Sequence, residues 1–476
     1  MQPIETDVIV VGGGLAGLAS AVALSDAGLR VTVLEAQKAL GGRARSWRHA
    51  PSGDVVDTAA QVIHSEQRNL LRLVERLGTG GRIAWLPGLA TLATAPRPTT
   101  LQHRRWPLPL SLVPDLARMP GLSWLDLLSS LRAVCRSLRY TERDAGELDA
   151  VSGREWLQRC GVAPAAVDLL WRPLAASALY APLEQCSAAA LARVHAMLLG
   201  ERQLHFGVPR VGLSDLYVAP AVAAIEHAGG RVLSGAPVMR LVPSEAGHRV
   251  MLKGGTELAA RHVVLAVPPY ELDQLVPGLV DLAYFPPSSA TRILLWFDRP
   301  LTKERLWFAP WGENRLNCCF QDLSNARSAL SGRDAVIAGT MIDSERLAIF
   351  SDQELVSMTI NEIAEFAPRA QRAQLVHREV LRLPLAVSRP VPGSERHRPP
   401  AVTRLPRVFL AGDWTRTRLP GSLDSAARSG ALAAERVLEA VGRPRQLTVS
   451  PHLPGSVPRR RTEARGPHPS WRREPV

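Results

Sequence analysis

Two adjacent residues near the end of the chain, Gly412 and Asp413, have the types and the setting of a ligand site. They follow the apolar run VFLA at 408–411, and a loop and the helical stretch Ser425 to Ala440 come after them. This order predicts a buried strand that ends in a tight turn. A carboxylate at the carboxyl end of such a strand can accept hydrogen bonds from a polyol, such as the ribityl chain of a flavin.

A glycine motif near the N-terminus can bring the backbone close to a phosphate. The residues of this G-x-G-x-x-G motif are Gly12, Gly14 and Gly17. The motif separates the apolar run Val8 to Val11 from the helical stretch Leu15 to Leu24, and a strand-like segment, Arg30 to Leu34, follows and ends at Glu35. This order predicts a βαβ unit in which the glycines hold a pyrophosphate at a helix N-terminus and Glu35 binds a ribose hydroxyl.

Two alternative interpretations of this segment are weaker. The first is a glycine-rich turn without a ligand, which the complete strand, helix and terminal acid disfavour. The second is a membrane span over Val8 to Leu24, where all residues but Ser20 are apolar or glycine. The acids Glu5 and Asp7 just before it, three consecutive glycines and a length of 17 residues argue against a span.

Length and composition indicate a globular protein of two large domains. The chain has 476 residues, of which 46% are hydrophobic. Its five cysteines are an odd set without metal-ligand spacing, and no basic and then apolar leader opens the sequence. These features predict reduced thiols and a cytoplasmic protein, and no metal site is expected.

The net charge of +13 raises the question of an anionic partner. The basic residues are dispersed and nearly all are arginine, so nucleic acid is not expected as a partner. The segment 443–476 holds eight Arg against two Glu and is rich in proline, which predicts a disordered basic tail. An anionic membrane surface on the inner face of the cell membrane is one hypothesis for its partner, and a solvated tail without a partner is the alternative.

The pattern of motifs predicts an α/β protein in which each domain is discontinuous in sequence. Residues 1–75, 205–270 and 400–442 are expected to form a Rossmann-like dinucleotide-binding domain. In the first block, Gly41 and Gly42 allow a tight loop from which Arg43 and Arg45 can face a phosphate or flavin, with a solvated basic loop as the alternative.

The two insertions, 76–204 and 271–399, are expected to build an α+β substrate domain. The first is rich in Leu, Pro and Trp, and a helical stretch such as Leu122 to Leu138 would bury one face in a core and offer another to lipid. Ordinary core is the simplest interpretation of these residues. A lipophilic tunnel is the alternative with a functional meaning.

The paired ends of the chain resemble the flavin amine oxidase and carotenoid desaturase superfamily, whose members hold one FAD between an N-terminal βαβ unit and a C-terminal Gly-Asp turn. The middle is similar to the hydroxysqualene dehydroxylases, squalene-associated FAD enzymes of bacterial hopanoid pathways. The segments that carry the resemblance are 171–187, 208–232, 294–300 and 411–430.

The resemblance implies a role for individual residues in binding FAD. Those implied to contact it, with the adjacent loop glycines, are Gly12, Gly14, Gly17, Glu35, Gly42, Arg43, Val238, Gly412, Asp413 and Leu423. Val238 would meet the adenine through its backbone, Asp413 the ribityl chain, and Leu423 the isoalloxazine. The chain departs from the family pattern at two places. Relatives commonly have Asp-x-Gly where this chain has Asp57-Thr58-Ala59, and they often have Glu where this chain has Asp424.

The implied activity is reductive dehydroxylation of hydroxysqualene to squalene, with a lipophilic isoprenoid as substrate and an electron donor that the sequence does not name. An acid must protonate the leaving hydroxyl. His64, Tyr180 and Asp57 are candidates, and the role stays unassigned.

Three alternatives stay open: a carotenoid desaturase of the phytoene type, an amine oxidase, and a flavoprotein without turnover. Amine oxidases of this superfamily usually have Lys where this chain has Arg292, and a guanidinium cannot act as a base.

Overall fold

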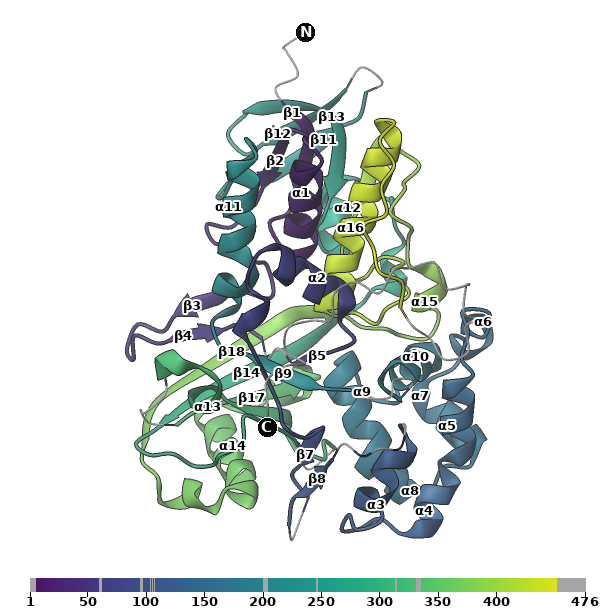
Figure 1. Cartoon of the computed structure of the whole chain (residues 1–476), viewed down its shortest axis with the longest axis vertical. Helices are drawn as coiled ribbons and strands as arrows, with labels where there is room; N and C mark the ends of the chain where they lie inside the picture. Colours follow the sequence, from purple (N-terminus) through teal and green to yellow (C-terminus); the bar gives the residue numbers. More distant parts are fainter. Residues whose placement is uncertain are drawn as a thin grey trace.

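The computed structural model describes residues 6–451 except 60–61, 95–96, 103, 105, 107, 200–203, 245–246, 313–314 and 331–334. A mainly parallel sheet with its helices occupies one end of the molecule, and a mainly antiparallel sheet lies beside a group of helices at the other (Figure 1). Within the described part of the chain, no helix combines the length and the apolar character needed to cross a bilayer.

The first sheet joins segments that are far apart in the sequence. Its strands are β1 (Thr6–Val11), β2 (Val31–Leu34), β10 (Arg231–Leu233), β11 (Val238–Val242), β12 (His248–Leu252), β13 (Glu257–Leu265) and β19 (Val408–Leu410). Their order is β10-β2-β1-β13-β12-β11, with β19 beside the second half of β13. The first four strands in this order and β19 are parallel, as the buried aliphatic runs predict.

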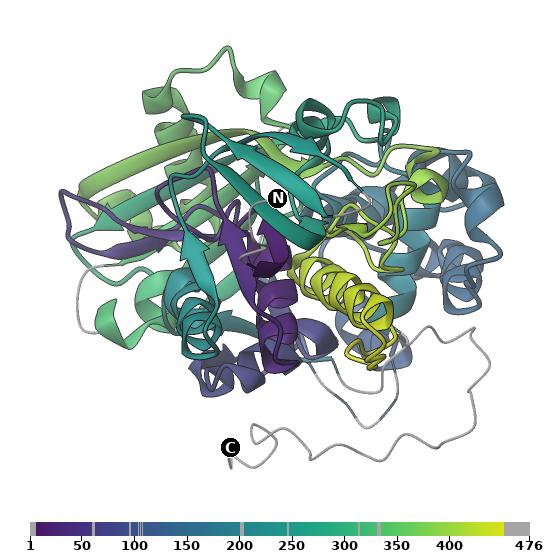
Figure 2. The ribbon, with the colours of Figure 1, turned by 90° about the horizontal axis from the view of Figure 1, so that it is seen from above.

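Helices cover this sheet and complete the predicted βαβ unit. They are α1 (Leu15–Asp26), α2 (Arg68–Arg76), α11 (Ala219–His227), α12 (Pro269–Leu275) and α16 (Leu423–Ala440). Seen from above, α1 and α16 lie side by side against one face of the sheet (Figure 2). A Cβ at Gly430 would lie 2.2 Å from the Ala16 carbonyl oxygen, so glycine allows this close approach.

The second sheet is built mostly from the later insertion. Its strands are β18 (Leu375–Ser388), β14 (Pro287–Phe297), β17 (Val336–Ile342), β16 (Asn317–Asp322), β15 (Leu306–Phe308), β7 (Ala90–Leu92) and β8 (Thr99–Leu101), in that order. Alternate residues of β14 enter different cores: Ile293 and Leu295 pack in a cluster with residues of α14 (Asp352–Phe366), and Leu294 packs on the other face.

The first insertion forms the helical group beside this sheet. Its helices are α3 (Val113–Leu116), α4 (Trp124–Ser129), α5 (Leu131–Leu138), α6 (Ala145–Leu148), α7 (Gly153–Cys160), α8 (Pro164–Ala166), α9 (Arg172–Leu179) and α10 (Ala188–Leu199), with a π-helical turn at Val167–Trp171. Trp156 and Trp171 are buried in its core, as the simplest interpretation of the tryptophans predicts, whereas Trp106 and Trp124 are exposed and contradict it. The stretch expected to be helical from Leu122 to Leu138 is divided at Ser130 into α4 and α5.

Short elements connect the two ends. They include the hairpin β3 (Ser46–Arg48) and β4 (Val55–Asp57), the small sheet β5 (Ile63–His64), β9 (Phe206–Pro209) and β6 (Ile83–Trp85), and the helices α13 (Leu323–Ala326) and α15 (Ser394–His397).

The beginning of the expected disordered tail is ordered, which corrects its boundary at residue 443. The backbone N–H groups of Leu447 and Thr448 donate to Glu435 Oε1 at 2.7 and 2.8 Å, and Val449 N donates to Asn69 Oδ1 at 2.9 Å. Carboxylate and amide acceptors on α16 and α2 thus hold a segment whose composition alone indicated disorder. Residues 452–476 lie outside the described residues.

Candidate functional site

Four parallel strands end at one edge of the first sheet and bring the predicted site residues together. The residues paired at this edge are Val11 with Leu34, Val11 with Leu265, and Leu265 with Leu410. Gly12 and Glu35 each follow directly after one of these strands, and Gly412 follows one residue later. The carboxyl ends of parallel strands are where α/β proteins bind ligands.

The three glycines of the motif have different physical roles. Gly12 has φ +106°, and a Cβ on it would lie 2.6 Å from the Ala266 carbonyl oxygen. A Cβ on Gly17 would lie 1.9 Å from the Gly12 carbonyl oxygen. Gly14 precedes α1, and no described residue other than its chain neighbours has an atom within 4 Å of where its Cβ would be. Gly12 and Gly17 are therefore required by packing, while the space at Gly14 is open to a ligand.

The carboxylate of Glu35 lies against the glycine loop. Its Oε2 accepts a hydrogen bond from Gly13 N at 2.7 Å, and its Oε1 accepts one from Gln37 N at 2.8 Å. The carbonyl oxygen of Glu35 accepts a hydrogen bond from Ala236 N at 2.9 Å. This bond holds the start of β11, where the half-buried Val238 lies, next to Glu35. Glu35 and Val238 thus lie at the same end of the sheet.

The loop at 41–45 lies against the glycine motif and reaches the C-terminal turn. Gly41 N donates to Gly13 O at 2.9 Å, and Gly42 has φ +58°. Arg43 Nη2 donates to Asp413 Oδ1 at 2.7 Å. Burial lowers the pKa of Arg43, but the charge and hydrogen bond of Asp413, together with the nearby Tyr270 and Glu271, raise the pKa overall. The two predicted residues are therefore in direct contact.

Residues that the sequence analysis did not single out hold the turn around Asp413. The buried Arg398 donates to the carbonyl oxygens of Asp413 and Trp414, and Ser429 Oγ accepts a hydrogen bond from Gly412 N at 2.8 Å. Arg398 also forms an ion pair with Glu395 at 3.5 Å, but the backbone carbonyls that it holds in the turn are 15 and 16 positions later, so no local signal marks this role.

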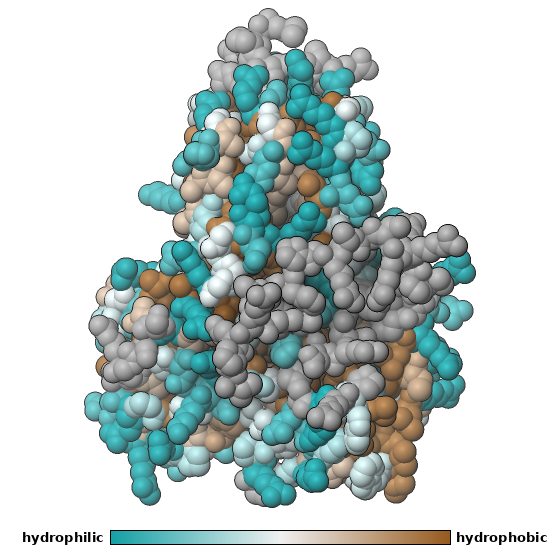
Figure 3. All heavy atoms as spheres, in the orientation of Figure 1, coloured by the Kyte–Doolittle hydropathy of each residue, from teal (hydrophilic) through white to brown (hydrophobic). Residues whose placement is uncertain are grey.

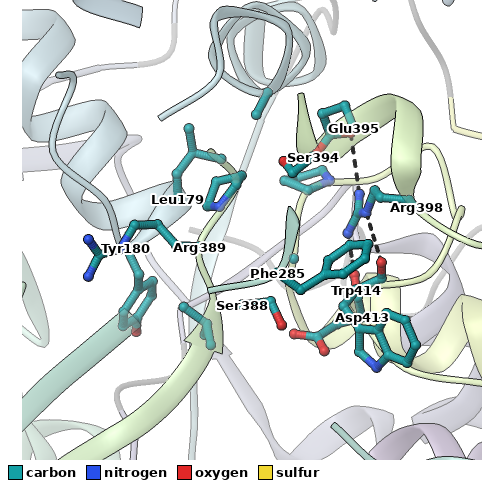
Figure 4. A pocket seen from close by; sticks show the side chains of 15 residues that line it. Leu179, Tyr180, Phe285, Ser388, Arg389, Ser394, Glu395, Arg398, Asp413 and Trp414 are labelled. Atoms are coloured by element: carbon teal, nitrogen blue, oxygen red, sulfur yellow. Dashed lines mark hydrogen bonds and ion pairs between the residues drawn. The ribbon is translucent and has the colours of Figure 1, made fainter. Parts of the chain in front are cut away.

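A pocket that is partly open to solvent adjoins Asp413. Its walls include Leu179 and Tyr180 at the end of α9, Ser388 of β18, and Phe285. In Figure 4 Ser388 lies between Tyr180 on one side and Asp413 on the other. The pocket is therefore lined by residues from both ends of the molecule and mixes apolar walls with a few polar groups.

Leu423 and Asp424 begin α16 near this site. Leu423 is half-buried and packs against the core under α1. Asp424 is buried and its Oδ1 accepts hydrogen bonds from the N–H groups of Asn69 and Leu70, both at 2.8 Å. Burial raises the pKa of Asp424 to about 6. Asp424 thus anchors the N-terminal turn of α2.

The three candidate acids lie in different surroundings. Of the three, Tyr180 lines the pocket. Neither His64 nor Asp57 is among the described residues that line it. Burial lowers the pKa of His64 to about 4. Asp57 forms a buried ion pair with Arg327 and accepts a hydrogen bond from Leu213 N at 3.0 Å. The surroundings of His64 and Asp57 are those of structural groups.

Arg292 is buried on β14 and has neutral hydrogen-bond partners. It donates to Thr340 Oγ1 at 2.7 Å and to Gln321 Oε1 at 2.9 Å. Burial lowers the pKa of its guanidinium.

Residues 15–438 match the family described as "Flavin containing amine oxidoreductase". The chain belongs to this family. It is an FAD-dependent oxidoreductase, and the open space at Gly14, the Arg43 and Asp413 pair and the uncapped N-terminus of α1 fit this cofactor.

Two relatives are similar to this chain over almost their whole length. The 15-cis-phytoene desaturase of Synechococcus elongatus is 26% identical over 464 residues, which cover 90% of this chain and 95% of the relative. The hydroxysqualene dehydroxylase of Rhodopseudomonas palustris is 29% identical over 449 residues, 91% of this chain and 98% of the relative.

Solved structures share the fold of this oxidoreductase at low sequence identity. Putrescine oxidase aligns with a TM-score of 0.69 at 18% identity, over 92% of this chain and 99% of that one. A putative protoporphyrinogen oxidase from Exiguobacterium aligns with a TM-score of 0.66 at 17% identity, over 92% and 98% of the two chains. The predicted flavin amine oxidase architecture is confirmed.

Proposed function

We propose that this flavoprotein removes the hydroxyl group of hydroxysqualene to form squalene, in the biosynthesis of hopanoids or related triterpenoids. The observation that carries the proposal is the position of α9. Its segment, 171–187, carries the resemblance to hydroxysqualene dehydroxylases, and it supplies Leu179 and Tyr180 to the pocket beside Asp413. The 29% identity over 98% of a hydroxysqualene dehydroxylase supports the same assignment.

The proposal includes the residues that hold FAD. Gly12, Gly14 and Gly17 would place the backbone and the N-terminus of α1 against the pyrophosphate, and Glu35 would bind the adenosine ribose. The remaining proposed contacts are Gly42, Arg43, Val238, Gly412, Asp413 and Leu423. When bound and reduced, FAD supplies a hydride.

The protein's own contribution would be to bind the isoprenoid, exclude water and hold a proton near the leaving hydroxyl. Residues 76–204 and 271–399 would form the substrate domain, and 1–75, 205–270 and 400–442 the FAD domain. Tyr180 fits the proton-holding position because it lines the pocket and a phenol carries its proton at neutral pH.

The second candidate function is desaturation of a phytoene-like polyene. It is favoured by the 26% identity over 95% of the Synechococcus phytoene desaturase. Both reactions require FAD beside an isoprenoid, and they differ in the direction of hydride transfer.

The two are separated by product analysis. FAD-loaded protein is incubated without oxygen, with hydroxysqualene and chemically reduced flavin in one reaction and with phytoene and oxidised flavin in another. Gas chromatography with mass spectrometry should detect squalene above the protein-free control. Desaturated polyenes without squalene would instead assign the protein as a desaturase. Absence of both products with bound flavin verified would indicate a flavoprotein without turnover on these isoprenoids.

A further inference from the structure

An exposed apolar surface lies on α4 and α5, at the end of the molecule opposite the first sheet. Trp124, Leu125, Leu128 and Leu131 are 58%, 76%, 55% and 53% exposed. Hydrophobic atoms gather at this corner of the molecule (Figure 3), where Figure 1 places α4 and α5. We call these four residues the apolar surface. Contiguous exposed apolar residues of this size mark interaction sites for proteins or membranes.

The opposite side of the same helices is already packed. Ala133 and Ser137 of α5 are fully buried, and Leu127 and Val134 pack against the core of the helical group. The four outward-facing side chains of the apolar surface are therefore not needed to pack this core. Two helices with one buried face and one exposed apolar face fit a membrane interface better than an ordinary solvated surface.

Arginines adjoin the apolar surface. Between residues 104 and 139 the sequence has six Arg and two Asp, a net charge of +4. Arg132, Arg136 and Arg139 are exposed on α5 and at its C-terminal end, directly after Leu131. Asp126 accepts hydrogen bonds from Ser123 N and Oγ at 2.8 and 2.6 Å, and so caps its own helix.

We propose that the apolar surface inserts into the headgroup region of a membrane that contains anionic lipids, with Arg132, Arg136 and Arg139 contacting the phosphates. Helices that lie in a membrane interface typically carry tryptophan and leucine beside arginine, as α4 and α5 do. The positive charge of these arginines favours an anionic membrane over a second copy of this chain as the partner of the apolar surface. Two copies of this chain would bring like-charged arginines together, whereas an anionic bilayer neutralises them.

The test is flotation of the FAD-loaded protein with vesicles of phosphatidylcholine and phosphatidylglycerol. The double variant Leu125→Asp/Leu128→Asp should reduce the bound fraction about tenfold or more. Ile349→Asp is the control, because Ile349 is 83% exposed in a turn outside α4 and α5, and its replacement should leave binding unchanged. Flavin content and thermal midpoint verify that each variant is folded.

Two further variants test whether the apolar surface, rather than the basic tail, makes the contact. Arg132→Glu/Arg136→Glu should weaken binding to anionic vesicles and have little effect on vesicles of phosphatidylcholine alone. A chain shortened after Pro451 should retain vesicle binding if the surface on α4 and α5 is the main contact. Unchanged binding of the double aspartate variant would overturn the proposal. So would a dimer in sedimentation that this variant abolishes, because it would assign the surface to self-association.

Discussion

Arg43 and Asp413 are 370 positions apart in the sequence, and their side chains form an ion pair of 2.7 Å. Arg43 comes from the loop that follows β2, and Asp413 from the turn after β19. Both lie at the carboxyl edge of one parallel sheet, so the first and last blocks of the chain close on the same site. The ion pair joins the loop after β2 and the turn after β19, for each of which the sequence predicted a flavin contact.

Replacement of Asp413 by Ala should weaken FAD binding about 10- to 100-fold, because hydrogen bonds with charged groups contribute about 1.5–3 kcal/mol. Fluorescence titration of flavin-free protein with FAD measures this. Asp298→Ala is the control, since Asp298 forms an exposed ion pair with Arg299. Equal affinity of the two variants would remove Asp413 from the proposed site.

Gly14→Ala and Gly17→Ala should separate cofactor contact from packing. Gly14 has an extended backbone with φ −75° and open space around it, so alanine should fold normally and weaken FAD binding. Gly17→Ala places a Cβ 1.9 Å from the Gly12 carbonyl oxygen and should destabilise the protein by about 1–3 kcal/mol even without FAD. Thermal midpoints of both flavin-free variants, compared with their FAD affinities, test the distinction. A Gly14→Ala variant that binds FAD normally would contradict it.

Tyr180→Phe should reduce turnover about a hundredfold if the phenol holds the proton for the leaving hydroxyl. The backbone of Tyr180 is left-handed, with φ 53°, and Ser288 Oγ donates to its carbonyl oxygen at 2.8 Å. Phenylalanine keeps these features and removes the hydroxyl alone. Tyr284→Phe is the control, because Tyr284 stacks on His397. Single-turnover rates should fall for Tyr180→Phe with unchanged flavin content, and an unchanged rate would exclude the role.

Asp424→Asn should alter how stability depends on pH. Burial raises the pKa of Asp424 to about 6 in the folded protein, above about 3.9 in an unfolded chain. The folded state therefore binds the proton more tightly, so this contribution is present below about pH 4 and is lost as the pH rises through 6. Asparagine cannot ionise, so the variant should gain about 2–3 kcal/mol relative to wild type between about pH 4 and pH 7. Thermal midpoints across this range measure the difference, and a constant difference would contradict the assignment.

The sequence by itself determined the βαβ unit, because its signals are local. Glycine spacing, a β-branched run and a terminal acid lie within about 30 residues, and the structure has β1, α1 and β2 where they were expected. The Gly-Asp turn after a buried strand was predictable for the same reason. The segment after residue 443 was predicted wrongly up to Val449, because its order depends on Glu435 and Asn69 rather than on its own composition.

Only the tertiary structure decided which distant groups meet. Arg43 reaches Asp413 because β1, β2, β13 and β19 end at one edge, and that strand order is absent from any single motif. Arg398 supports the turn through backbone carbonyls, which carry no residue identity. The exposure of Trp124 and Leu125 likewise depends on which face of α4 the core uses. Local conformation follows from neighbouring residues, whereas contacts across hundreds of positions depend on how the sheets and helices pack.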